Sequence, residues 1–175
     1  MRAALLPERK KITMNTKDEL MDWLRDAYAM ERGLEVSLRK LADSEETPFA
    51  LREQARLHLH QTEGHAESVK QALEELGSDT SALKTGLAKT MESLKGLGTF
   101  FAKDEEIKDV LAANAAEHFE IACYKAIRTG ASLLGLTSVE MMCDRILFEE
   151  EEMAKWLDEH LPEMVTHYLH REAHA

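Results

Sequence analysis

Apolar residues recur every three or four positions along most of this chain, which is the period of an amphipathic α-helix. The pattern predicts a long helix over residues 16–41 and a second one from about residue 48 to residue 76. It predicts a third helix over residues 104–134 and a fourth that begins at residue 137 or 138. Four long helices with one apolar face each are typical of an all-α bundle.

Residue types that favour helix starts mark three of these boundaries. Thr16 followed by Glu19 has the spacing of a capping box, and Pro48 suits the first turn of a helix. Thr137 or Ser138 is expected to cap the fourth helix. The sequence therefore predicts where each of these helices begins.

The segments that end or join the helices differ in length. Gly77 and Gly135 follow the second and third helices, as glycine often does at a helix C-terminus. Residues 78–102 are too many for a tight turn, so we predict a connection that contains a short helix and crosses the length of the bundle. Pro162 is expected to break or restart the fourth helix.

A polar residue interrupts the apolar face near the middle of each predicted helix. Such interruptions matter because polar groups are costly to bury without a partner. The interrupting residues are Glu31 in the first helix, Gln61 and His65 in the second, Glu117 and Glu120 in the third, and Glu150 in the fourth.

Spacing from the turns places these residues at one level of the bundle. Glu31 and Gln61 each lie about 15 residues from a turn centred near residue 46, which is about 22 Å along a helix. Glu120 and Glu150 lie about 15 residues on either side of a turn centred near residue 135. If the two hairpins pack side by side, the polar residues form one belt across the core.

Several carboxylates in one buried belt repel one another unless some are protonated or cations lie between them. Carboxylate and imidazole ligands suit iron or manganese, with zinc as a weaker alternative. Four or more carboxylates suit two metal ions, since carboxylates can bridge. The sequence therefore predicts two divalent cations, with iron preferred, and leaves His65 open as a ligand or as a residue behind the ligands.

Charge and composition narrow the partners. The formal net charge of −11 argues against nucleic acid and anionic lipid, which need a basic surface. No run of about 18 apolar residues occurs, so no membrane-spanning helix is predicted. The two cysteines, Cys123 and Cys143, have no disulfide or metal-site spacing and fit reduced thiols in a cytoplasmic protein.

Three stretches resemble a known family. They are "DWLRDAYAMERGLE" (22–35), "EHFEIACY" (117–124) and "ILFEEEEMAKWLDEHLPE" (146–163). They are similar to the YciE/YciF family of bacterial stress-induced ferritin-like proteins, and more to its YciE branch. The resemblance implies a ferritin-like four-helix bundle with one long crossover, a homodimer, and a di-iron centre in the core.

The resemblance also assigns the metal ligands residue by residue. It implies one carboxylate from the first helix, two from the third and one from the fourth, which are Glu31, Glu117, Glu120 and Glu150. This chain departs from the pattern at two positions. Gln61 stands where the family usually has glutamate, and Met153 stands where a ferritin-like histidine would follow Glu150.

Two functions follow as expectations. The first is a di-metal carboxylate protein of the bacterial stress response, with redox chemistry on a small oxidant such as peroxide or oxygen. The alternative is a non-enzymatic stress or interaction protein that keeps the bundle with a degraded or empty metal site, which Gln61 and Met153 favour. Whether the protein is an enzyme stays open, and no catalytic residue is assigned.

The domain organisation is simple. We expect residues 1–13 to be an N-terminal extension outside the fold, residues 14–169 to form the bundle, and residues 170–175 to be a frayed tail.

Overall fold

The computed structural model describes residues 14–45, 47–78 and 105–173. These residues form four helices and no strand: α1 (Met14–Asp43), α2 (Phe49–Glu75), α4 (Glu105–Leu134) and α5 (Thr137–Glu172). The all-α class predicted from the sequence is confirmed.

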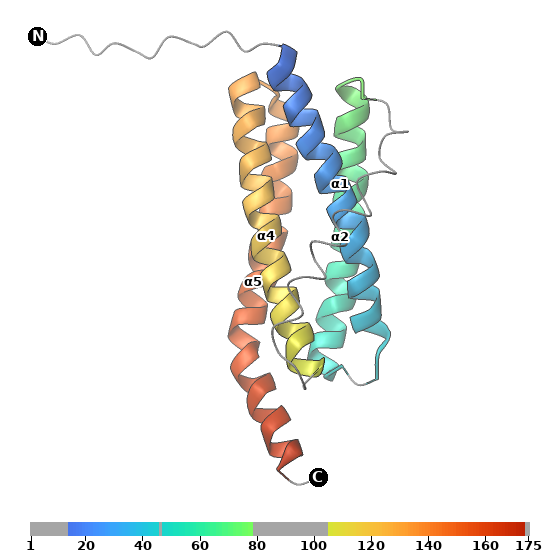
Figure 1. Ribbon diagram of the computed structural model, residues 1–175, viewed down its shortest axis with the longest axis vertical. Coiled ribbons are helices and arrows are strands. Elements are labelled where there is room, and N and C mark those ends of the chain that lie inside the picture. The colour runs from blue at the N-terminus through green and yellow to red at the C-terminus, as the bar shows by residue number, and fades with distance from the viewer. Residues whose placement is uncertain (1–13, 46, 79–104, 174–175) are drawn as a thin grey trace, which may run out of the picture.

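The four helices pack as two antiparallel hairpins. α1 packs along α2, and α4 packs along α5; the hairpins meet where α1 contacts α4 and α2 contacts α5. Figure 1 shows that α2 ends at the opposite end of the bundle from the start of α4. This arrangement is the ferritin-like bundle with one long crossover. The short helix predicted within the crossover lies outside the described residues.

Two helix starts differ from the sequence prediction. α1 begins at Met14, so Thr16 lies inside the helix, and this end is tied to α2 by Lys17, which donates to the carbonyl oxygen of Leu76 at 3.1 Å. Leu136, and not Thr137 or Ser138, occupies the N-cap position of α5. The start of α5 differs because the connection between α4 and α5 is short, and both the N–H and the carbonyl of Leu136 form hydrogen bonds with the two helices.

The α4–α5 connection shows this double use directly. Leu136 N–H donates to the carbonyl of Ala131 at 2.9 Å and closes α4, while its own carbonyl accepts from Glu140 N–H at 3.0 Å and opens α5. Gly135 adopts a φ of +71°, which residues with a Cβ rarely adopt. Gly77 ends α2 in the same way with a φ of +81°. Both glycine terminators were predicted correctly.

The expected break at Pro162 is wrong, because α5 continues through it to Glu172. Proline leaves the carbonyl four residues earlier without its helical donor, which is destabilising in a helix interior. The side chains on either side compensate for that loss. Leu157 and Met164 both pack in one buried cluster with Leu51 of α2 and Val110 of α4. The helix therefore extends into the segment expected to fray from residue 170.

The core contains a polar layer between apolar clusters. A large cluster occupies the half of the bundle near the α4–α5 turn and includes Leu24, Leu73 and Ile127. Smaller clusters built on Leu38 and Leu157 occupy the other half. No helix among the described residues is long and apolar enough to cross a membrane. Both cysteines are free.

Candidate metal centre

Six buried acidic and histidine side chains meet between the apolar clusters, and we call them the carboxylate–histidine cluster. Every helix contributes at least one of them, and the exposed fraction of each residue is 3% or less. The cluster consists of Glu31 from α1, His58 and His65 from α2, Glu117 and Glu120 from α4, and Glu150 from α5.

The ligand atoms fall into two groups that share one carboxylate. His58, Glu117, Glu120 and Glu150 form the His58 group, and Glu31, His65 and Glu150 form the His65 group. Within each group, one candidate ligand atom per residue lies within 4.8 Å of all the others. Each group could hold a metal ion, and Glu150 is common to both.

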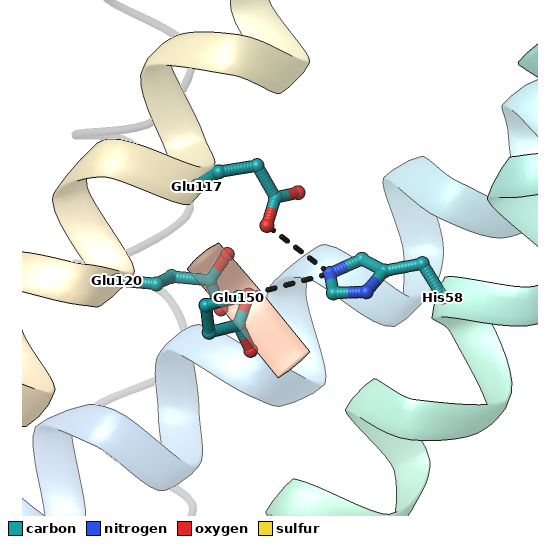
Figure 2. Close-up of side chains that lie close together, drawn as sticks. All are labelled: His58, Glu117, Glu120 and Glu150. Carbon is teal, nitrogen blue, oxygen red and sulfur yellow. Dashed lines mark ion pairs between the residues drawn. The ribbon is translucent and has the colours of Figure 1, made fainter. Parts of the chain in front are cut away.

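Glu150 lies between the two histidines. Its Oε2 is 3.4 Å from Nε2 of His58, and its Oε1 is 2.9 Å from Nδ1 of His65. Glu117 Oε2 lies 3.2 Å from the same His58 nitrogen, and Glu31 Oε2 lies 3.7 Å from the same His65 nitrogen. Figure 2 shows Glu117, Glu120 and Glu150 converging on one side of the His58 ring. Each imidazole therefore presents one nitrogen to the carboxylates.

The other nitrogen of each imidazole is held from behind. Nδ1 of His58 lies 3.1 Å from Oε1 of Gln61, and Nε2 of His65 lies 2.7 Å from Oε2 of Glu149. An oxygen partner behind a metal-binding histidine fixes its orientation and tautomer and makes it a better ligand. Gln61 and Glu149 are therefore in the positions of residues that orient ligands.

Tyr124 supports the carboxylate on α1. It is fully buried, and its hydroxyl donates a hydrogen bond to Oε1 of Glu31. Tyr28, one turn before Glu31 on α1, is partly buried and packs against the large apolar cluster. The hydroxyl donor to Glu31 thus comes from α4.

Several buried polar atoms of the cluster have no hydrogen-bond partner, although imidazole nitrogens are close to some of them. They are Glu31 Oε2, His65 Nδ1, Glu117 Oε2, Glu120 Oε1 and both carboxylate oxygens of Glu150. Such atoms are costly to bury. Three other buried side-chain atoms among the described residues also lack a partner, Arg25 Nε, Arg52 Nε and Thr62 Oγ1, but six such atoms gather in this cluster. The residues present therefore fit a site whose polar atoms are satisfied by cations.

Burial shifts the pKa values of the carboxyl groups in a consistent direction. Desolvation raises the pKa of Glu31 and Glu120, and it raises that of Glu117 to about 8. Glu150 is the exception: burial alone would raise its pKa, but the two imidazoles, at 3.4 and 2.9 Å, outweigh burial and hold that pKa well below the usual range. Glu31, Glu117 and Glu120 therefore hold their protons more tightly than an exposed glutamate does.

The pKa values of both histidines are raised, whereas burial alone would lower them. Desolvation lowers their pKa values, but the nearby carboxylates of Glu117 and Glu150 raise the pKa of His58 well above its usual range. The nearby carboxylates of Glu150 and Glu31 raise the pKa of His65 to about 10. Cations that bind to this cluster would therefore compete with protons for the same side chains.

Five of the six residues predicted from the sequence meet in this cluster, and the sixth does not. Gln61 is only half-buried, and its amide oxygen contacts Nδ1 of His58, on the side of the ring away from Glu117 and Glu150. His58 belongs to the cluster although it was not among the residues predicted from the sequence. The signal for it was present: His58 and His65 are seven residues apart, which is two turns on one helix face.

A ferritin-like bundle with a buried carboxylate–histidine cluster defines the class of this protein. The sequence profile of the family described as a domain of unknown function (DUF892) matches residues 15–170. The chain belongs to this family, and its resemblance to YciE/YciF proteins is confirmed.

Solved structures show the same fold. A protein of Xanthomonas campestris pv. campestris is 31% identical, with a TM-score of 0.74 over 90% of this chain and 99% of that one. The E. coli stress protein YciF is 26% identical, with a TM-score of 0.73 over 88% of this chain and 99% of that one. A Rhodopseudomonas palustris protein is 25% identical, with a TM-score of 0.67 over 85% and 96%.

Proposed function

We propose that this protein holds two divalent cations, iron or manganese, in the centre of its bundle and uses them in a bacterial stress response. The observation that carries the proposal is the position of Glu150 between two groups of buried ligands. The stress role is supported by similarity to YciF, which is described as a stress protein.

Charge balance supports two cations over one. The cluster contains four carboxyl groups and two histidines. With neutral imidazoles, four carboxylates balance the four positive charges of two divalent ions. A single ion would leave excess negative charge in the core or require retained protons. Oxygen and nitrogen ligands without thiolate favour iron or manganese.

Different residues of the cluster would hold each of the two ions. Glu150 would bridge, His58 with Glu117 and Glu120 would hold one ion, and Glu31 with His65 would hold the other. Tyr124 fixes one oxygen of Glu31 by its hydrogen bond. When bound, a pair of iron or manganese ions supplies the electrons needed to reduce a small oxidant such as peroxide or oxygen.

The apolar surroundings determine which reactants the cluster meets. Leu34, Ile146 and Met153 lie in the clusters on either side of the polar layer and are buried. These packed side chains leave no space for a large substrate beside the ligands. This supports a small oxidant as the reaction partner.

The test is metal content per chain after anaerobic reconstitution with iron(II) or manganese(II) and removal of excess metal. We expect about two ions in the natural protein and fewer than one in Glu150→Gln, because both groups lose their shared ligand. Glu151→Gln is the matched control, since Glu151 is an exposed neighbour that pairs with Lys125.

Two results would decide against the proposal. Equal metal content in Glu150→Gln and Glu151→Gln would show that the cluster is not the binding site. Two bound ions without any consumption of added peroxide or oxygen would leave the alternative, a metal-binding stress protein without redox chemistry.

A further inference from the structure

A groove between α1 and α4 leads from the surface to one side of the carboxylate–histidine cluster. It encloses about 180 Å³, which is room for several water molecules. Of the six cluster residues, only Glu117 and Glu120 line it. Figure 1 shows α1 and α4 adjacent along this face of the bundle. The groove therefore reaches the His58 group and not the His65 group.

The α4 wall of the groove consists of small residues. Ala112, Ala113 and Ala116 line it, and they continue the helix face that carries Glu117 and Glu120. Larger side chains at these positions would fill the space against Leu38 and its neighbours on α1. The width of the groove thus depends on alanine at a few positions.

The groove runs from an outer end that carries both charges, Lys40 and Asp109, to two carboxyl groups at its inner end. Ser37 and Lys40 of α1 are exposed at the surface, and Asp109 of α4 lines the same end. Glu117 Oε2 and Glu120 Oε1 lie at the inner end, and both are buried without a hydrogen-bond partner. A small ion that loses part of its water in the groove would regain oxygen ligands there.

A second groove on the opposite side is also lined by carboxylates, Glu149, Glu152 and Glu159, but it does not reach the cluster. It encloses about 250 Å³ between α2 and α5 and ends at Gln61 and Glu149. These residues lie behind the imidazoles, and no cluster residue lines this groove. An ion that entered here would meet the far side of both histidines.

We propose that the α1–α4 groove is the entry port for divalent cations, and that the His58 group is filled before the His65 group. This inference rests on the proposed function. It adds a route and an order: the ion first meets Glu117 and Glu120, and the shared Glu150 then connects that position to Glu31 and His65.

The experiment follows cobalt(II) uptake by metal-free protein in a stopped-flow spectrometer, using the visible absorption of bound cobalt. Ala112 is replaced by Val, Leu and Phe to narrow the groove in steps. We expect the uptake rate to fall with the size of the side chain, by tenfold or more for Phe, with unchanged cobalt content at the end. Ala126→Phe on the exposed face of α4 and Leu57→Trp in the second groove are controls expected to load at the natural rate.

Two results would overturn the inference, and they are distinguishable. Natural uptake rates in all three Ala112 variants would exclude this port, and slow uptake in Leu57→Trp alone would assign entry to the other groove. If Ala112→Phe alters the final cobalt content, the uptake rates of the Ala112→Val and Ala112→Leu variants are compared with the natural rate instead. Failure of the natural protein to bind cobalt would instead overturn the proposed function itself.

Discussion

Gln61 holds His58 in place from behind, with its amide oxygen 3.1 Å from Nδ1 of the imidazole. The opposite nitrogen of the same ring faces Glu117 and Glu150. The glutamine that departs from the family pattern therefore contacts a histidine of the cluster from behind and does not face its carboxylates.

Removing the Gln61 amide should weaken the His58 group without removing a ligand. Loss of such an orienting partner typically costs about 10- to 100-fold in metal affinity. We expect Gln61→Ala to show a loss of this size, measured by competition with a chelator for one of the two bound ions. Gln61→Glu retains an oxygen acceptor and should recover most of the affinity.

Gln71→Ala provides the comparison for this effect. Gln71 is an exposed glutamine on α2 that bonds to Glu67 near the surface. The Gln71→Ala protein should bind both ions normally. A natural affinity in Gln61→Ala would mean that His58 needs no support from Gln61, and an equal loss in Gln61→Glu would mean that Gln61 acts by some other contact.

Tyr124→Phe should destabilise the metal-free protein. The substitution leaves Oε1 of Glu31 buried without its hydroxyl donor. The free energy of unfolding should fall by about 1–3 kcal/mol, the usual cost of a buried polar group that loses its partner. Urea denaturation of the metal-free protein measures this. Tyr28→Phe, on a partly buried tyrosine outside the cluster, should change stability by less than half as much.

Helix pattern and residue spacing predicted the bundle and the level of its polar belt, because both follow from periods that one sequence displays. Glu31, Glu117, Glu120 and Glu150 meet as that spacing required. Spacing alone could not decide between His58 and Gln61, which lie on one face of α2. Whether His58 or Gln61 reaches the centre depends on helix rotation and side-chain direction, which only the packed bundle specifies.

Helix ends were less predictable for a related reason. Local preference favoured Thr137 or Ser138 as the cap of α5, but the tight connection used Leu136 for both helices. At Pro162, local preference predicted a break, whereas buried side chains on either side kept the helix continuous. Tertiary packing overrides local propensity in both places.

Pro162→Ala should stabilise the protein, because alanine restores a backbone donor inside a continuous helix. Proline in a helix interior costs about 3 kcal/mol relative to alanine. Since α5 tolerates it, part of that cost is already relieved, and we expect an increase of about 1–2 kcal/mol in the free energy of unfolding. Thermal and urea unfolding measure it. An unchanged stability would mean that the helix has already adapted fully to the proline.

The stability of the metal-free protein should fall as the pH rises from 6 to 9. Burial raises the pKa of Glu117 from 4.5 to about 8, and nearby carboxylates raise that of His65 from 6.5 to about 10. Over this range the folded state binds more protons than the unfolded chain, so folding is favoured at lower pH. Each proton of difference changes the free energy of unfolding by about 1.4 kcal/mol per pH unit.

The contribution of Glu117 is complete below pH 4.5 and is lost as the pH passes about 8, while that of His65 is complete below pH 6.5 and is lost towards pH 10. The lowered pKa of Glu150 acts only in acid and adds nothing to this change. Cation affinity should have the opposite trend and strengthen with pH, since each ion displaces protons. Urea unfolding of metal-free protein at pH 6 and pH 9, with Glu117→Gln as the variant that flattens the slope, measures the first trend. A metal-free protein that is equally stable at both pH values would contradict the protonated cluster.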